Sequence, residues 1–164
     1  MVLGEVIYPF YYLAMKSIRP LTASDKSSWD PLWQGYLKFY KTELSDEQSE
    51  LTWQRLLDPD FNMYCLVAEV DGAIQGMTHY SFQNSTWAEV NYCYLEDLYV
   101  EPSLRGGGIG RSLINAVRVI AEGAGSSRLY WNTDATNETA RKLYDSYELE
   151  SGKVQYRIPL VEGD

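Results

Sequence analysis

The chain has few of the side chains from which disulfide frameworks and metal sites are built. Its 164 residues include two cysteines, Cys65 and Cys93, and a single histidine, His79. Two cysteines in apolar, strand-like surroundings predict buried, reduced thiols in a cytoplasmic protein rather than a disulfide scaffold. No group of histidine, cysteine and acidic residues has the spacing of a metal site, so we expect no bound metal.

Positive charge is also scarce. Lysine and arginine number 14 against 23 aspartates and glutamates, which gives a net charge of −9 and a pI of about 4.6. A nucleic-acid-binding domain would carry a basic face, so the acidity argues against this class of partner and we expect no nucleic acid. The acidity suits a cationic partner such as a small amine or a basic peptide, but acidity that only keeps the protein soluble explains it equally well.

No hydrophobic run is long enough to cross a membrane. The apolar stretch at 6–14 lacks the leading positive charge of a signal peptide and is shorter than a bilayer span. We therefore interpret residues 1–14 as an N-terminal extension and residues 15–164 as a single domain, which is an ordinary length for one hydrophobic core. These features predict a cytoplasmic protein with no membrane partner.

The hydrophobic pattern predicts a mixed α/β domain. Helical spacing follows Ser27, Ser45, Gly108 and Asn137, and strand-like runs lie at 16–21, 62–70, 73–83, 89–100, 126–133 and 153–160. Pro31 fits a helix only within the first turn, so the first helix should begin near Ser27 or later. Ser45 and Gln48 have the spacing of a capping box at the start of the second helix.

A glycine-rich turn lies between a strand and a helix in residues 94–117, "YLEDLYVEPSLRGGGIGRSLINAV". The first N–H groups of a helix lack intrahelical partners, and glycine lets an anion approach them, so the segment predicts a phosphate or pyrophosphate site. It matches neither the P-loop, which needs a lysine after the glycines, nor the dinucleotide pattern G-x-G-x-x-G. It matches Arg-x-x-Gly-x-Gly through Arg105, Gly108 and Gly110. Gly106 and Gly107 occupy free positions of this pattern, so we expect them to be the more replaceable pair.

The segment "RGGGIG" resembles the acetyl-coenzyme A signature of the GNAT N-acetyltransferases, and the surrounding elements follow the order of that family. "YLEDLYVEPSLRGGGIG" is similar to polyamine acetyltransferases of the spermidine/spermine type. "LYWNTDATNETARKLYD" is similar to small fungal enzymes that acetylate histones, polyamines or D-amino acids. The resemblance covers 16–159 and implies the GNAT fold, a twisted mixed sheet of six to seven strands flanked by four helices in three αβα layers.

The resemblance implies acetyl-coenzyme A as the cosubstrate and assigns residues to hold it. Backbone N–H groups of the glycine segment would bind the pyrophosphate, and the backbone of the preceding strand would pair with the pantetheine arm. Asn137 stands where an asparagine of the family contacts that arm, although an asparagine there also serves as a plain helix cap. The implied cofactor-binding residues are Leu98, Tyr99, Val100, Arg105, Gly106, Gly107, Gly108, Ile109, Gly110, Arg111, Asn137 and Tyr144.

The resemblance also implies catalytic groups for acetyl transfer to a primary amine. Tyr144 matches a tyrosine whose hydroxyl points at the sulfur, where a phenol can protonate the leaving thiolate. An alkylamine has a pKa of about 10.4, so deprotonating it at neutral pH costs about 4 to 5 kcal/mol, which a carboxylate helps to offset. Glu96 matches the proposed base of the polyamine-type enzymes, with Asp97 in a structural or substrate-orienting role. Adjacent strand residues face opposite sides, so only a bulge would bring both into one cleft.

Two other functions stay open from the residues alone. Cys93 and His79 could form a nucleophilic pair, but a buried thiol that meets a histidine by chance is the more ordinary explanation. An acyl-coenzyme A sensor without transfer activity is the second, and Tyr144 and the strand carboxylates argue against it. The leading hypothesis is an N-acetyltransferase for a polyamine, an amino acid or a lysine-type amine. We expect a homodimer or a larger assembly.

Overall fold

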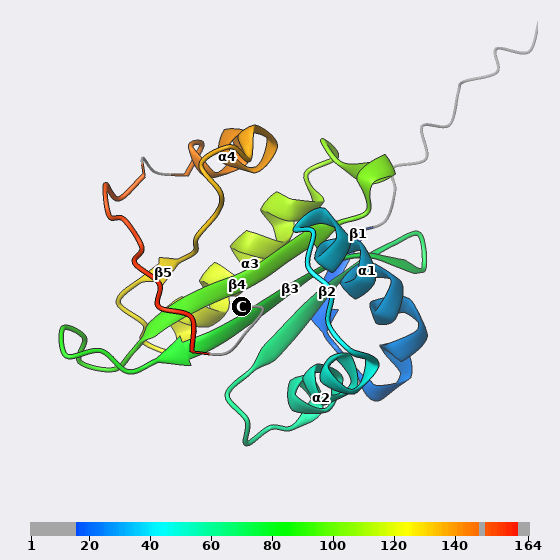
Figure 1. The fold of residues 1–164 in the computed structure, drawn as a ribbon, viewed down its shortest axis with the longest axis horizontal. Coiled ribbons are helices and arrows are strands. Elements are labelled where there is room, and N and C mark those ends of the chain that lie inside the picture. Colours follow the sequence, from blue (N-terminus) through cyan, green and yellow to red (C-terminus); the bar gives the residue numbers. More distant parts are fainter. Residues whose placement is uncertain (1–15, 148–149, 161–164) are drawn as a thin grey trace, which may run out of the picture. The chain divides into compact units, whose positions relative to one another are not determined.

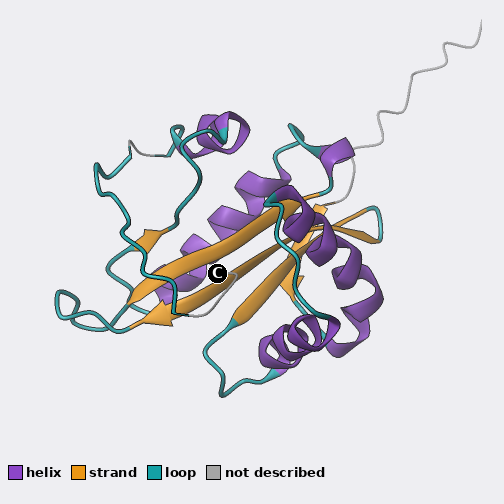
Figure 2. Cartoon of the chain, viewed as in Figure 1, coloured by secondary structure: helices purple, strands orange, loops and turns teal. Residues whose placement is uncertain are grey.

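The computed structural model describes residues 16–147 and 150–160, so the predicted extension at 1–14 lies outside the described residues. The chain divides into two compact units, 1–131 and 132–164, and each is described by itself. Figures 1 and 2 show the elements. In chain order they are β1 (Lys16–Pro20), the 3-10 turn η1 (Ala23–Asp25), α1 (Lys26–Phe39), α2 (Asp46–Leu57), β2 (Tyr64–Val70), β3 (Ala73–Gln83), β4 (Tyr92–Val100), the 3-10 turn η2 (Pro102–Leu104), α3 (Ile109–Gly123), β5 (Leu129–Tyr130) and α4 (Glu138–Tyr144).

The first unit is built on one mixed sheet with strand order β1-β2-β3-β4-β5. The first four strands are antiparallel neighbours, and β5 runs parallel to β4. A parallel neighbour needs a crossover connection, which α3 supplies. Five strands form among the described residues, so the expectation of six to seven is not met there.

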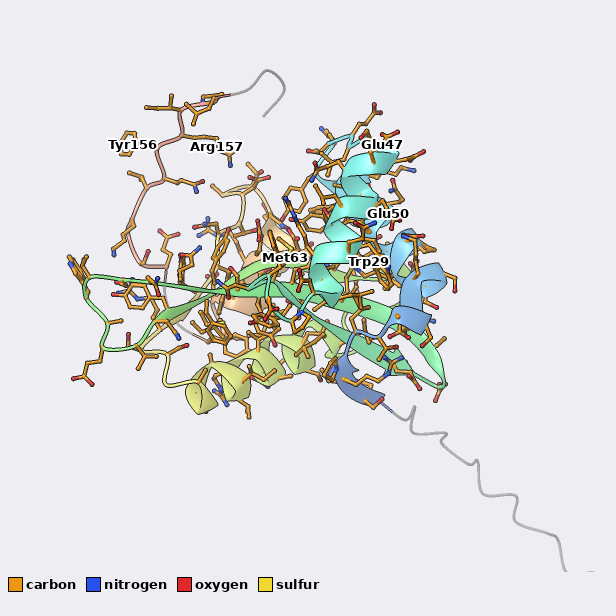
Figure 3. The ribbon with its side chains drawn as sticks, turned by 90° about the horizontal axis from the view of Figure 1, so that it is seen from below. Trp29, Glu47, Glu50, Met63, Tyr156 and Arg157 are labelled. Atoms are coloured by element: carbon orange, nitrogen blue, oxygen red, sulfur yellow. The ribbon has the colours of Figure 1, made fainter. Side chains whose placement is uncertain are left out.

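Helices cover both faces of this sheet. Figure 3 shows α1 and α2 on one side and α3 on the other, which is the predicted αβα layering within the first unit. Trp29, Trp33 and Trp53 are buried between the helices α1 and α2 and the sheet, where they pack on Cys65, Val67 and Met77. On the other face β3 packs closely on α3, because a Cβ on Gly76 would lie 3.1 Å from the Ile109 side chain.

Helix boundaries follow local signals with one exception. Ser45 caps α2 and its hydroxyl accepts a hydrogen bond from the Gln48 N–H at 3.1 Å, as predicted. The first helix begins earlier than predicted, at Lys26, and Pro31 lies beyond its first turn. The turn η1 leads directly into α1, and Pro31 is exposed, so its ring disturbs no buried packing.

The second unit contains α4 and a segment at 150–160 without helix or strand. The predicted strand at 153–160 is wrong, since the described residues there form no strand. Val154, Tyr156, Ile158 and Leu160 alternate with the period of a strand, but their side chains are 74% to 91% exposed. Alternation alone does not make a strand, because the backbone groups must also find a paired neighbour.

Candidate active site

The glycine segment forms an exposed turn that opens α3. Gly106 and Gly108 adopt left-handed backbone conformations with φ of 82° and 81°, and Gly108 is the N-cap of α3. Residues 106–108 are exposed, and no side chain caps the helix. The first N–H groups of α3 have no partner within the helix, so this turn fits the diphosphate of a nucleotide. The expectation that Gly106 is replaceable is wrong, since a side chain at φ 82° is strained.

Two cationic side chains brace this turn. The Arg105 Nε donates to the Val100 carbonyl oxygen at 3.0 Å, and its guanidinium lies 5.4 Å from the ring centroid of Tyr99 and 5.6 Å from that of Phe39. The Lys16 Nζ donates to the Gly107 carbonyl oxygen. No sequence pattern points to the Lys16 contact, because Lys16 and Gly107 are 91 residues apart. Both cations hold the turn against the sheet and add positive charge beside it.

The strand β4 leaves one edge open where it approaches the glycine turn. On one side Leu98, Tyr99 and Val100 pair with β3. On the other side β5 pairs only with Cys93 and Tyr94, so no described strand continues the ladder alongside residues 95–100. Unpaired backbone groups at such an edge can bind an extended ligand. Among the predicted residues, Tyr99 and Ile109 are buried, whereas Arg111 is exposed on the first turn of α3.

A β-bulge brings two adjacent carboxylates onto the same face of the sheet. His79 pairs with Asp97 and Tyr80 pairs with Leu95, so Glu96 is an extra residue with no opposite partner. Such an insertion breaks the alternation of the strand. Asp97 therefore shares the face of His79, and Glu96 lies close enough to both for their charges to act on its carboxylate. The condition that the sequence left open, a bulge at this point, is met.

The environment of Glu96 favours the protonated carboxyl group. Glu96 is exposed at its residue surface, but the surrounding protein removes part of the water from its carboxylate. This desolvation raises the pKa of Glu96, and the negative charge of Asp97 raises it further. The phenol of Tyr36 faces the same pair, and burial followed by the Asp97 charge raises its pKa as well. A carboxylate with raised proton affinity is better suited to accept a proton than an ordinary one.

A buried hydrogen-bonded chain lies behind Asp97. The Trp29 indole Nε1 donates to the Nε2 of His79 at 3.1 Å, and the Nδ1 of His79 lies 2.8 Å from the Asp97 Oδ2. The side chains of His79 and Asp97 are 3% and 12% exposed. An indole nitrogen can only donate, so Nε2 accepts and the imidazole carries its proton on Nδ1, which donates to Asp97. From the sequence, His79 was considered only as a partner for a cysteine, and its hydrogen bonds with Trp29 and Asp97 were not predicted.

The cysteine alternative does not match the geometry. Cys93 lies opposite Phe82, which is three residues from His79 along β3. Both ring nitrogens of His79 already have hydrogen-bond partners, Trp29 and Asp97. Burial raises the pKa of the Cys93 thiol to about 11, which disfavours the thiolate that nucleophilic attack requires. Cys93 is therefore an inert buried thiol.

The two remaining predicted residues lie at either end of α4 in the second unit. The Asn137 side-chain oxygen accepts from the Ala140 N–H at 3.3 Å, and its amide donates to the Thr133 Oγ1 at 3.2 Å. Asn137 is thus a helix cap, and its contact with a cofactor stays a prediction. Tyr144 is the last residue of α4 and is half-buried, and its role at a leaving thiolate stays a prediction as well.

The family model described as the acetyltransferase (GNAT) family matches residues 29–147. The chain belongs to the GNAT acetyltransferase family. It is an acetyl-coenzyme A-dependent N-acetyltransferase, which decides against a sensor without transfer activity. The glycine turn of this acetyltransferase, with two left-handed glycines and an uncapped helix start, fits the diphosphate of that cosubstrate.

Named relatives agree with this assignment. A D-amino-acid N-acetyltransferase of Saccharomyces cerevisiae is 33% identical over 148 residues, which cover 88% of this chain and 89% of the yeast protein. A thialysine N-epsilon-acetyltransferase of Bos taurus is 39% identical over 89 residues, 49% of this chain and 52% of the bovine protein. An aminoglycoside N-acetyltransferase in complex with CoA is 19% identical and superposes with a TM-score of 0.77 over 90% of this chain and 97% of its own. The last comparison shows a shared fold.

The described part of the acetyltransferase has neither a metal-ligand cluster nor a membrane-spanning helix. Within residues 16–147 and 150–160, no three histidine, cysteine or acidic side chains group as metal ligands. None of the helices described in these ranges is both long and apolar enough to span a bilayer.

Proposed function

We propose that this acetyltransferase acetylates a primary amine carried by a cationic substrate and that Glu96 accepts the proton of that amine. The bulge in β4 is the observation that carries the proposal, because it sets Glu96 and Asp97 on one face beside Tyr36. Two carboxylates and a ring face attract an alkylammonium ion and then favour its deprotonation.

The proposed reaction needs one proton acceptor and one proton donor. Acetyl-coenzyme A supplies the acetyl thioester, a new C–N bond forms with the amine, and the C–S bond breaks. Glu96 takes the proton that the amine loses, either directly or through water, and Tyr144 gives a proton to the sulfur. Backbone N–H groups at the open edge of β4, from Leu98 to Val100, would stabilise the negative charge that develops on the acetyl oxygen. The turn at 105–110 would hold the diphosphate.

The acidic pair also bears on the choice of acceptor. A free amino acid carries a carboxylate next to its reacting amine, and Glu96 and Asp97 would repel that charge. A thialysine-type side chain or a polyamine presents an amine with no carboxylate nearby. Named relatives act on both kinds, D-amino acids and thialysine. We therefore place diamines, polyamines and lysine-type side chains ahead of α-amino groups for this chain.

A thiol-release assay with acetyl-coenzyme A tests both parts of the proposal. We expect turnover with spermidine, a short diamine and thialysine that exceeds turnover with D-amino acids whose only amine is the α-amino group. Glu96→Gln should lower kcat/KM for the amine by about 100-fold or more and remove the acidic limb of its pH profile. Glu89→Gln, which removes an exposed carboxylate ahead of β4, is the matched control and should behave as the wild type.

Two outcomes would contradict the proposal. A Glu96→Gln enzyme that keeps its activity and its acidic limb would exclude Glu96 as the base. A preference for D-amino acids would overturn the assignment of acceptor. The expected homodimer is a separate prediction, which sedimentation velocity of the full chain would check.

A further inference from the structure

The single histidine of this chain lies in the core, where an ionisable group needs a reason. His79 is 2% exposed and lies among aromatic rings, with centroids 6.0 Å from Trp29 and 5.6 Å from Trp33. Both of its nitrogens are engaged, one by the donor Trp29 and one by the acceptor Asp97. Such a fully satisfied polar chain holds its members in one arrangement. Its far end is Asp97, next to the bulged Glu96.

We propose that Trp29 and His79 are positioning residues for amine deprotonation, which form a buried hydrogen-bonded chain that holds the Asp97 carboxylate in place beside Glu96. This inference rests on the function proposed above for Glu96. Trp29 selects the tautomer of His79, and His79 donates to one oxygen of Asp97. Neither residue is exposed to the substrate, so they act through the carboxylates.

The charge of the His79 imidazole determines how the hydrogen-bonded chain affects the pKa of Glu96. Burial lowers the pKa of His79, but the neighbouring Cys65 and Asp97 side chains outweigh burial and raise it overall. The geometry opposes this rise, because a proton on Nε2 would set two N–H donors against each other across the 3.1 Å contact with Trp29, so we expect a neutral ring. A neutral His79 leaves the full negative charge of Asp97 next to Glu96. That charge raises the pKa of Glu96, whereas a cationic His79 would lower it.

The groups that face His79 come from each element packed against it. The strand β2 contributes the Cys65 thiol, and β4 contributes the Asp97 and Glu96 carboxylates. The helix α1 contributes the indoles of Trp29 and Trp33, which do not titrate, and the Tyr36 phenol beside Asp97. The two carboxylates are therefore the anionic groups whose charge His79 would offset.

The wild-type protein provides a test that needs no substitution. Since the chain holds one histidine, selective ¹⁵N labelling of histidine yields one pair of ring signals. We expect a neutral ring with the proton on Nδ1 throughout the pH range in which the enzyme is active. A ring that is cationic at neutral pH, or protonated on Nε2, would overturn the proposal. This measurement is independent of Glu96.

Substitution of Trp29 tests the link to the reaction. Trp29→Phe removes the indole donor, so His79 gains a proton as the pH falls and its positive charge lowers the pKa of Glu96. The acidic limb of kcat/KM for the amine should then move to lower pH by about one unit, a tenfold change in proton affinity. Trp33→Phe is the matched control, since it removes a buried indole that donates to Ser49 at 3.2 Å and should leave the limb in place. An unchanged limb in Trp29→Phe, or an equal shift in both variants, would overturn the proposal.

Substitution of His79 separates positioning from packing. His79→Leu removes the donor to Asp97 and should lower kcat/KM for the amine about tenfold, with little change in KM for acetyl-coenzyme A. His79→Asn keeps an N–H for Asp97 and should recover most of this loss. Equal losses in both variants would indicate a packing role and overturn the proposal. If Glu96→Gln retains its acidic limb while the His79 ring is neutral, the assignment of Glu96 as the base is wrong, but the hydrogen-bonded arrangement of Trp29, His79 and Asp97 is confirmed.

Discussion

The backbone of Gly35 lies directly against the phenol ring of Tyr99. A Cβ on Gly35 would overlap the hydroxyl oxygen and lie 2.7 Å from the Tyr99 Cζ. The missing side chain lets α1 approach β4 closely enough for Tyr36, the next residue, to face Asp97. The close contact at Gly35 therefore helps to set the position of Tyr36 beside Asp97 and Glu96.

Gly35→Ala should therefore destabilise the protein, although alanine is the better helix former. Propensity favours alanine by about 1 kcal/mol, but the overlap with a buried ring costs about 1 to 3 kcal/mol. We expect a net loss of about 1 kcal/mol in the free energy of unfolding, measured by urea denaturation. Gly123→Ala is the control, since a Cβ there meets nothing within 4 Å and should be neutral or stabilising. A stabilised Gly35→Ala protein would contradict the close contact.

The two glycines at the free positions of the motif should differ in tolerance. Gly106→Ala places a side chain at φ 82°, which costs about 1 to 2 kcal/mol, so KM for acetyl-coenzyme A should rise about five- to thirtyfold. Gly107 has no left-handed φ, and a Cβ there would lie 3.3 Å from the Leu104 carbonyl oxygen, so a small shift accommodates it. Steady-state kinetics would check the order, and a larger effect at Gly107 would contradict it.

Lys16 should assist cosubstrate binding from the first strand. Lys16→Met removes both the hydrogen bond to the Gly107 carbonyl and a positive charge beside the turn. We expect KM for acetyl-coenzyme A to rise about threefold with kcat nearly unchanged, a change of somewhat less than 1 kcal/mol, as is usual for an exposed charge. The effect should shrink in high salt because ions screen the exposed charge. Lys16→Arg keeps the charge and should stay close to the wild type, whereas a loss equal to that of Lys16→Met would argue against a charge effect.

The stability of the first unit should depend on pH through Asp25. Arg19 donates to both carboxylate oxygens at 2.7 and 3.0 Å, which lowers the pKa of Asp25 from 3.8 to about 2. A lowered pKa adds stability above the unfolded pKa, and this contribution is lost as the pH falls through 3.8 toward about 2. Asp25→Asn should therefore be about 1 to 2 kcal/mol less stable at neutral pH, and the difference should vanish near pH 2. Urea denaturation at several pH values would measure it, and a difference that persists in acid would contradict this origin.

Tyr144→Phe tests the proposed proton donor to the leaving thiolate. A phenol that serves the sulfur acts on the chemical step, so turnover should fall about 100-fold while the affinity for acetyl-coenzyme A changes little. Turnover and cosubstrate binding would be measured separately, by thiol release and by calorimetry. Tyr147→Phe, three residues along the chain, is the control and should retain activity. A loss of affinity with unchanged turnover would assign Tyr144 to binding instead.

Much of the candidate site could be read from the sequence because its signals are local. The Arg-x-x-Gly-x-Gly pattern lies within six residues, and the structure places it at the start of α3. The cap formed by Ser45 and the hairpin at Asp71 and Gly72 are likewise set by neighbouring residues, with left-handed φ values of 51° and 82° in the turn.

Other features depend on partners that are distant in the chain. The segment 153–160 alternates as a strand does, but no described strand pairs with it. The prediction that Gly106 is replaceable was wrong because the turn that joins β4 to α3 requires a left-handed backbone conformation at this residue. The hydrogen bond from Lys16 to the Gly107 carbonyl and the one between His79 and Asp97 join residues of different elements that are distant in the sequence. No local sequence pattern predicts these contacts.

The sequence by itself determined the family, the order of the elements and the pair of acidic residues, since these are properties of residue types and short spacings. Only the tertiary structure decided that Glu96 and Asp97 share a face. The register of β4 against β3 slips by one residue between His79 and Tyr80. A strand's register is set by the packing of its neighbours and not by its own residues, so the bulge that brings the two carboxylates together appears only when the sheet is assembled.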